Sequence, residues 1–388
     1  MNRGKWRGLV AMVLLAVAAN HDFLSPARGA SLPGAPSPYD FAGFYNQLEP
    51  YLLRYHDPAF PDRPTDLRGR FSYQPGGAYD LYGSCDVVYL LWTIGELEPR
   101  TTAAGRAEWA GLIQSFQDPS TGWFDRGNET PHFKEHATAY ATGALALLGA
   151  RPRYPFRWAE KITASRKSTE RWLGGIWWDV VWVGSHQGGG VAAALAMSDS
   201  APEEWFDWYF DWLDHEVNPV TGLWQRAFYN RVITRPNKND LGGAAHFWWI
   251  YEYRHRPLPF PERVIDTCLK LQLESGLWDR KPRKGDFPYC INLDAINGLA
   301  ASSRQLRSAG QGYRTPDILA ALEKYLRRTN QVLTSPGALA RLYTNSHDLP
   351  GALIGVAEAD QFMKAVAGQG RIQTRAEWRS VLGTICWL

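Results

Sequence analysis

Hydrophobic and polar residues along the chain follow two helical patterns. In the first, charged residues lie on one side only. The clearest case is Pro261–Leu273, where Val264, Ile265, Cys268 and Leu269 follow helical spacing. The other segments of this kind are Phe41–Tyr55, Ala104–Phe116, Arg157–Trp172, Glu203–His215 and Thr315–Leu333. The pattern predicts six amphipathic helices, each with one face in water.

Segments of the second kind are apolar or small on every side. His136–Leu148, Gly189–Met197 and Leu241–Tyr251 contain no Asp, Glu, Lys or Arg. A helix without a polar face must be surrounded by protein. Since the two kinds alternate, we expect an all-α fold of six helical hairpins, an (α/α)6 toroid with buried helices inside and amphipathic helices outside. It would form a single domain over residues 31–388.

A turn motif separates the two helices of each hairpin. Its fullest copies are Gln117–Asp125, Asn218–Gln225 and Gln272–Asp279. The glycines that mark the copies are Gly77, Gly122, Gly175, Gly222 and Gly276, which lie 45 to 54 residues apart. A degenerate sixth copy is expected at Pro336–Gly337. A repeat of this length is typical of a stacked array of supersecondary units.

These Gly-x-Trp turns resemble those of the squalene-cyclase and protein-prenyltransferase repeat toroids. The six hairpins are similar to those of six-hairpin glycosidases and toroid polysaccharide lyases. The resemblance covers nearly all of the chain after the first 30 residues and implies the toroid fold. The D-x-D-D and D-D-x-x-D motifs of terpenoid chemistry do not occur in the sequence. Residues 276–287 look like part of a prenyltransferase β-subunit, but Tyr289 and Cys290 stand where a zinc-binding His is expected.

In such a toroid all inner helices begin at one end, where their unpaired N–H groups gather. Polar residues are concentrated at these starts. The candidate catalytic residues are Asp86, His136, Tyr140, His186, His246, Asp294 and His347. The candidate substrate-binding residues are Trp92, Glu135, Gln187, Trp248, Trp249, Tyr289, Cys290, Asn292 and Asp348. Helix capping accounts for Asp and Asn at such positions, but it does not call for histidine.

Two glycan chemistries fit these residues. In a lyase, Tyr140 or Tyr289 with His136, His186 or His246 would remove the C5 proton of a uronate while a donor stabilises the enolate. In a hydrolase, two carboxyl groups would be drawn from Asp86, Glu135, Asp294 and Asp348. No cofactor is expected. Zinc held by His136, His186, His246 or Cys290 is an alternative that no local ligand spacing supports.

Composition and charge narrow the function classes. The chain has 18 Trp, 18 Tyr and 16 Phe, as expected for an aromatic structural repeat or a sugar-binding surface. The 42 Lys and Arg nearly balance the 39 Asp and Glu and form no cluster, which argues against a nucleic-acid partner. The four cysteines contain no C-x-x-C pair, so no zinc ribbon or redox motif is indicated.

The first 30 residues have the pattern of an export signal. Arg3, Lys5 and Arg7 precede the apolar run Leu9–Ala19, which is too short to cross a bilayer. We therefore expect a secreted or periplasmic monomer without a membrane span, acting on a glycan or another small molecule. The alternatives are a terpenoid- or isoprenoid-processing enzyme and a non-catalytic binding module.

Overall fold

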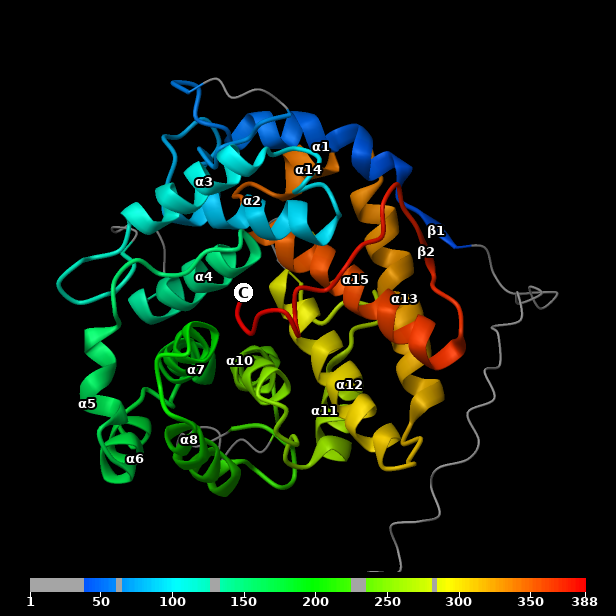
Figure 1. Ribbon diagram of the computed structural model, residues 1–388. Coiled ribbons are helices and arrows are strands. Elements are labelled where there is room, and N and C mark those ends of the chain that lie inside the picture. The colour runs from blue at the N-terminus through cyan, green and yellow to red at the C-terminus, as the bar shows by residue number, and fades with distance from the viewer. Residues whose placement is uncertain (1–37, 61–64, 126–132, 225–234, 281–284) are drawn as a thin grey trace, which may run out of the picture. The chain divides into compact units, whose positions relative to one another are not determined.

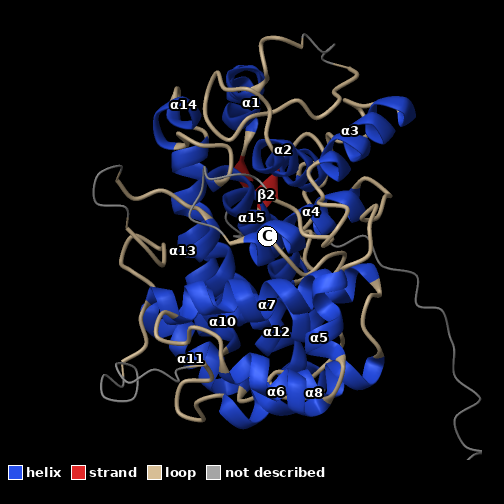
Figure 2. Cartoon of the chain, turned by 90° about the vertical axis from the view of Figure 1, so that its left-hand side faces the viewer, coloured by secondary structure: helices blue, strands red, loops and turns tan. Residues whose placement is uncertain are grey.

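The computed structural model describes residues 38–60, 65–125, 133–224, 235–280 and 285–388. These residues are mostly helical, which confirms the all-α prediction (Figure 2). The only strands among them, β1 (Tyr39–Asp40) and β2 (Ile372–Gln373), pair in parallel with Tyr39 opposite Ile372. No helix in this part of the chain is long and apolar enough to cross a membrane. The export signal predicted over residues 1–30 lies outside the described residues.

Six helices are buried on nearly all sides, and we call them the central helices. They are α2 (Leu81–Thr93), α4 (Lys134–Leu147), α7 (Val181–Ser198), α10 (Lys238–Tyr253), α12 (Cys290–Ser308) and α15 (Asp348–Ala367). Each packs against the next in chain order, and α15 packs back against α2 (Figure 1). Small residues permit these contacts: a Cβ atom on Gly190 of α7 would lie 2.8 Å from the Glu135 carbonyl oxygen of α4.

The amphipathic helices lie outside the central ones. They are α1 (Ala42–Tyr55), α3 (Ala103–Ser115), α5 (Glu160–Thr163), α6 (Arg166–Gly174), α8 (Glu203–Glu216), α11 (Pro261–Leu271) and α13 (Thr315–Leu333). Two short elements, the 3-10 helix η1 (Arg157–Ala159) and α14 (Ala338–Leu342), complete the helices. In α11, Val264, Ile265 and Cys268 are buried while Arg263 and Lys270 are exposed, as the helical spacing predicts.

The prediction of a single helix over Arg157–Trp172 was wrong, because this stretch is divided into η1, α5 and α6. The break lies at Ser165, whose backbone is extended and whose side chain accepts a hydrogen bond from the Ser168 N–H, 3.2 Å away. Thr169 Oγ1 also donates to the Ile162 carbonyl, 3.0 Å away. Local side-chain bonds of this kind compete with a continuous helix, and hydrophobic spacing does not detect them.

The repeated turns are held by their glutamines and tryptophans. Gln117 Nε2 donates to the carbonyl oxygens of Gly122 and Tyr154, at 3.0 and 2.8 Å. Gln272 Nε2 makes the same pair of bonds to Gly276 and Ala321, at 3.0 and 2.8 Å. Trp224 and Trp278 donate their indole N–H to carbonyls near the end of the preceding outer helix, those of Leu213 and Cys268. The turn with Gln272 and Trp278 is thereby tied both to its own helix and to the next repeat.

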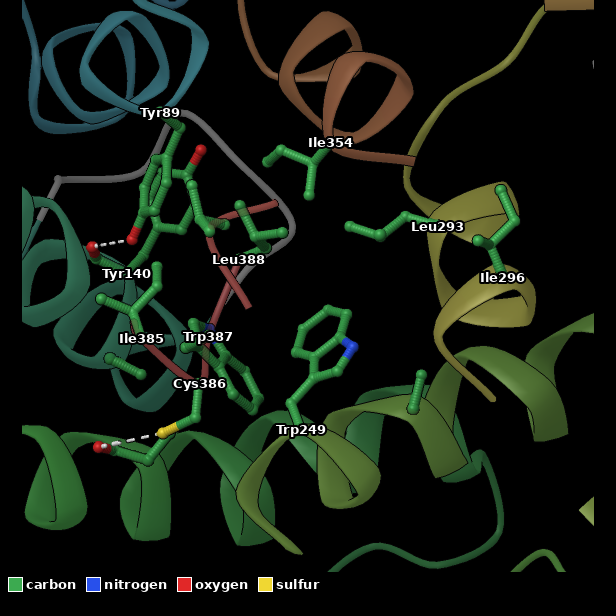
Figure 3. Close-up of a cluster of buried hydrophobic side chains, with 14 of the residues drawn as sticks. Tyr89, Tyr140, Trp249, Leu293, Ile296, Ile354, Ile385, Cys386, Trp387 and Leu388 are labelled. Atoms are coloured by element: carbon green, nitrogen blue, oxygen red, sulfur yellow. Dashed lines mark hydrogen bonds between the residues drawn. The ribbon is translucent and has the colours of Figure 1, made fainter. Parts of the chain in front are cut away.

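Residues 385–388 lie in the space between the central helices (Figure 1). Val381, Ile385 and Trp387 are fully buried, and the Cys386 thiol lies 3.9 Å from the Ala193 carbonyl oxygen of α7. Figure 3 shows Trp387 and Leu388 among side chains from several central helices, including Tyr89, Trp249 and Ile354. The sequence pattern did not predict that this segment forms part of the core.

A candidate active site at the starts of the central helices

A pocket of about 360 Å³ lies at the N-terminal ends of the central helices. Five of these helices, α4, α7, α10, α12 and α15, and the loop before α2 contribute to its wall. This is the end of the fold where the candidate residues were expected. Its lining residues are Tyr73, His136, Tyr140, Trp182, His186, His246, Trp249, Tyr289, Cys290, Asp294, Asn345, His347, Asp348, Pro350, Gly351 and Leu388. Its volume is at the small end of the range of ligand pockets.

The pocket brings together most of the residues selected from the sequence. Those that line it are His136, Tyr140, His186, His246, Trp249, Tyr289, Cys290, Asp294, His347 and Asp348. Asp86 does not line the pocket but contacts two residues that do, Tyr140 and His347. The pocket thus has a polar, histidine-rich wall with several aromatic side chains.

Five further candidates lie outside the pocket. Trp92 is near the C-terminal end of α2, and Trp248 packs against Gly298 of α12. Glu135 lies in the first turn of α4 and is half-buried, which raises its pKa. Two candidates support local backbone instead: Gln187 Oε1 accepts the Trp177 N–H at 3.3 Å, and Asn292 Oδ1 accepts the Trp278 N–H at 2.9 Å.

Asp86 is the centre of a buried hydrogen-bond network. Its Oδ1 accepts from the Tyr140 hydroxyl at 2.5 Å and from His347 Nδ1 at 2.8 Å. Its Oδ2 accepts from the Ser346 hydroxyl. Burial and the neighbouring Asp86 charge raise the pKa of Tyr140 well above its usual value, so that its phenol remains a donor. Because Nδ1 of His347 donates to a carboxylate, Nε2 is the proton-accepting nitrogen of the neutral ring.

Asp294 is the second carboxyl group of the pocket. It is 1% exposed, and its Oδ1 accepts no hydrogen bond from any residue in the described part of the chain. Burial raises its pKa well above the usual value of an aspartate. Burial favours the protonated form, in which a carboxyl group serves as an acid or a hydrogen-bond donor.

Three histidines from consecutive central helices meet in the pocket wall. The ring centroids of His136 and His186 are 4.7 Å apart, and those of His186 and His246 are 5.1 Å apart. Burial lowers the pKa of His246 to about 3, so this ring is neutral at neutral pH. Ser185 donates its hydroxyl proton to the Trp182 carbonyl at 2.7 Å, and it therefore accepts from His246 Nδ1, 2.6 Å away.

Tyr289 is positioned by an ion pair behind the pocket wall. Its hydroxyl donates to Asp279 Oδ2, and Lys238 Nζ lies 2.8 Å from both carboxylate oxygens of Asp279. Burial raises the pKa of Tyr289 above its usual value, and the neighbouring Asp279 raises it further. Asp279 follows the tryptophan of the repeated turn, so the turn itself supports a side chain of the pocket.

The sequence did not point to several residues of the site. Trp182 precedes His186 by four positions, and this helical spacing would have placed both on one face of α7. Ser346 lies between two residues of the pocket wall, Asn345 and His347. Tyr73 lies in the loop before α2, ahead of the turn marked by Gly77, and Leu388 is far from any predicted helix start. No sequence signal indicates either residue.

Within the described residues, no group of three or more His, Cys, Asp or Glu side chains is arranged to hold a metal ion. The expectation that the chain needs no cofactor stays a prediction. No protein-family model, curated protein or solved structure matches the chain.

Proposed function

We propose that the described helices form an (α/α)6 toroid, with the central helices as the inner ring and the amphipathic helices as the outer ring. The closed order of packing, from α2 through α15 and back to α2, supports this arrangement. The one-sided burial of α11 and α13 supports an outer position for the amphipathic helices. The broken stretch of η1, α5 and α6 takes the place of one outer helix.

We further propose that the chain is an exported, monomeric enzyme that acts on a carbohydrate. The observation that carries this proposal is the meeting, in one pocket, of His347, which Asp86 holds from behind the wall, and the buried Asp294 carboxyl group. His347 as a base and Asp294 as an acid could then act on the same bound substrate. Tyr73, Trp182 and Trp249 add aromatic side chains suited to contact the apolar faces of a sugar.

The geometry supports β-elimination on a uronate best. His347 Nε2 takes the C5 proton, and Asp86 stabilises the imidazolium that forms, as a buried carboxylate does in a catalytic triad. The electron pair of the C5–H bond forms the C4–C5 double bond while the C4–O bond breaks. Asp294 donates to the substrate carboxylate, where charge develops. The leaving oxygen takes the proton back from the His347 imidazolium, because the Tyr289 hydroxyl proton is donated to Asp279.

Hydrolysis is the second candidate, and the presence of two carboxyl groups in the pocket wall favours it. Asp294 would protonate the leaving oxygen, while Asp348 would act as base or nucleophile. Asn345 holds Asp348 in place, since Asn345 Nδ2 lies 3.1 Å from Asp348 Oδ2.

The pocket gives less support to the other two functions. A terpenoid-processing enzyme needs an apolar cavity, but the described lining includes four histidines and two aspartates and no phenylalanine. A non-catalytic binding module has no need of a carboxylate that fixes a histidine tautomer, as Asp86 does for His347.

A panel of uronate-containing and neutral polysaccharides tests the proposal. Elimination gives an unsaturated uronate that absorbs in the ultraviolet, whereas hydrolysis gives new reducing ends without that absorbance. The Asp294→Asn variant is the control for contaminating activity, because it keeps the shape of the side chain and removes the acid. No turnover on any polysaccharide of the panel would contradict the proposed function.

A further inference from the structure

The pocket has a floor made by residues near position 388. The indole ring of Trp387 lies 4.6 Å from the ring of His246 and 5.4 Å from that of His136, measured between centroids. Trp249 meets Trp387 edge-on at 6.0 Å (Figure 3). Leu388 itself lines the pocket and is 8% exposed. Leu388 therefore closes this part of the pocket, and Trp387 packs behind the pocket wall.

Beneath this floor the space between the central helices is filled. Tyr89, Leu293, Ile296 and Ile354 are all 1% exposed or less, and Figure 3 shows them around Trp387 and Leu388. Tyr140 joins the two layers, since it lines the pocket and its ring lies 4.6 Å from that of Tyr89. A ligand cannot continue through the molecule at this depth.

The wall of the pocket also comes from a narrow set of elements. In the described part of the chain, its residues belong to the central helices, to the loops directly before them or to the segment ending at Leu388. Among the described lining residues, none belongs to α1, α3, α6, α8, α11 or α13. A long groove for the interior of a polysaccharide would extend across the rim of the fold. The observed shape suits the end of a chain.

We propose that this pocket takes the terminal residue of a glycan and that the enzyme acts from the chain end, releasing one sugar per turnover. This inference rests on the proposed carbohydrate activity and deepens it. Phe133 gives further support, because it is 38% exposed at the start of α4 and its ring lies 6.4 Å from that of His186. It offers an apolar face beside the pocket to the next sugar of the chain.

The decisive experiment follows product lengths over time. An oligosaccharide of one defined length, prepared from a polysaccharide that the enzyme cleaves and labelled at its reducing end, is digested with the wild-type protein and quenched early. We expect single sugars and oligosaccharides shortened by one residue in the first samples. A mixture of intermediate lengths in those samples would overturn the inference and leave the carbohydrate activity in place. An absence of cleavage on every glycan would reject the proposed function itself.

Two variants test the floor and the rim. Leu388→Ala removes apolar contact from the floor, and we expect KM for the shortest substrate to rise about 10-fold. Leu382→Ala, a half-buried leucine of the same segment outside the pocket, is the matched control. Phe133→Ala is expected to raise KM for longer oligosaccharides only, whereas Phe260→Ala, 42% exposed at the start of the outer helix α11, leaves it unchanged. An unaltered KM in Leu388→Ala would contradict the position of the terminal sugar.

Discussion

The Asp86 carboxylate accepts hydrogen bonds from Tyr140, Ser346 and His347, although it has almost no contact with solvent. Three donors compensate for the loss of water around the charge. The same bonds fix the His347 ring and the nitrogen that carries its proton. Asp86 is therefore placed to position and stabilise His347, the base of the proposed reaction.

Replacing Asp86 with Asn separates this role from a structural one. Asn preserves the shape but presents an amide to His347, which favours the wrong tautomer. We expect kcat to fall about 10²–10⁴-fold while KM changes little, measured by steady-state kinetics on the glycan identified by the panel. Asp360→Asn is the matched control. Asp360 lies on α15 outside the pocket, and its carboxylate accepts hydrogen bonds from the backbone N–H groups of Arg371 and Ile372. Equal losses of kcat in both variants would refute the assignment.

The buried Asp294 carboxyl group should make the free energy of unfolding depend on pH. Its pKa is raised in the folded state, whereas an unfolded Asp titrates near 3.9. Above about pH 4 the unfolded chain has lost this proton and the folded chain retains it, so folding stability falls as the pH rises towards the folded pKa. The slope from this group is at most about 1.4 kcal/mol per pH unit.

The Asp294→Asn variant lacks this titration. We expect its free energy of unfolding, relative to the wild type, to increase between pH 4 and pH 7, as measured by urea denaturation at several pH values. His246 acts in the opposite direction, because its pKa is lowered to about 3 and protonation favours the unfolded chain below about pH 6.5. Comparing each variant with the wild type at the same pH removes that contribution. Parallel curves for both proteins would show that Asp294 is ionised in the folded state.

At the scale of elements, the repeated turns depend on glycines with left-handed backbone. Gly276 has φ +88°, and a Cβ atom there would lie 2.6 Å from the Lys324 carbonyl oxygen of α13. We expect Gly276→Ala to lower the free energy of unfolding by about 1–3 kcal/mol. Gly111→Ala is the control, since Gly111 lies inside α3 with no atom near its Cβ position. That variant is expected to gain roughly 0.5–1 kcal/mol in urea denaturation. Stabilisation by both substitutions would disprove the constraint at Gly276.

The sequence predicts some elements of this fold better than others. Hydrophobic spacing identified the buried faces of α11 and α13, and the turn motif identified where hairpins bend. It missed the break at Ser165, because capping there depends on side-chain hydrogen bonds and not on hydrophobicity. The prediction that Trp248 binds substrate was also not supported, since Trp248 does not line the pocket. A helix that is apolar on all sides does not reveal which side faces the centre, and Trp248 packs outward against Gly298.

The same limit applies to the candidate site. The polar residues near the predicted helix starts indicated the end of the molecule at which the pocket lies, since His136, His186, His246 and Asp294 all line it. The floor of the pocket was beyond prediction, because Trp387 and Leu388 reach it by long-range packing that no local pattern encodes. Ser346 belongs to the Asp86 network for a similar reason, as 260 residues separate the two partners.

At the scale of the whole molecule, residues 385–388 form a core that several central helices share. They lie between the central helices, so segments far apart in sequence share one set of contacts. Trp387 alone meets rings from α4 and α10, those of His136, His246 and Trp249. Stability is then a property of the assembled fold and not a sum over independent hairpins.

Trp387→Ala tests this role directly. The substitution leaves a cavity in the centre, and we expect a loss of about 3–5 kcal/mol in the free energy of unfolding. Far-ultraviolet circular dichroism and tryptophan fluorescence should report one coincident transition in the variant as in the wild type. Trp177→Ala is the matched control, because Trp177 is 52% exposed and its loss should change stability by no more than about 0.5 kcal/mol. Equal stabilities of the two variants, or separate transitions for the two probes, would show that the hairpins hold together without this central segment.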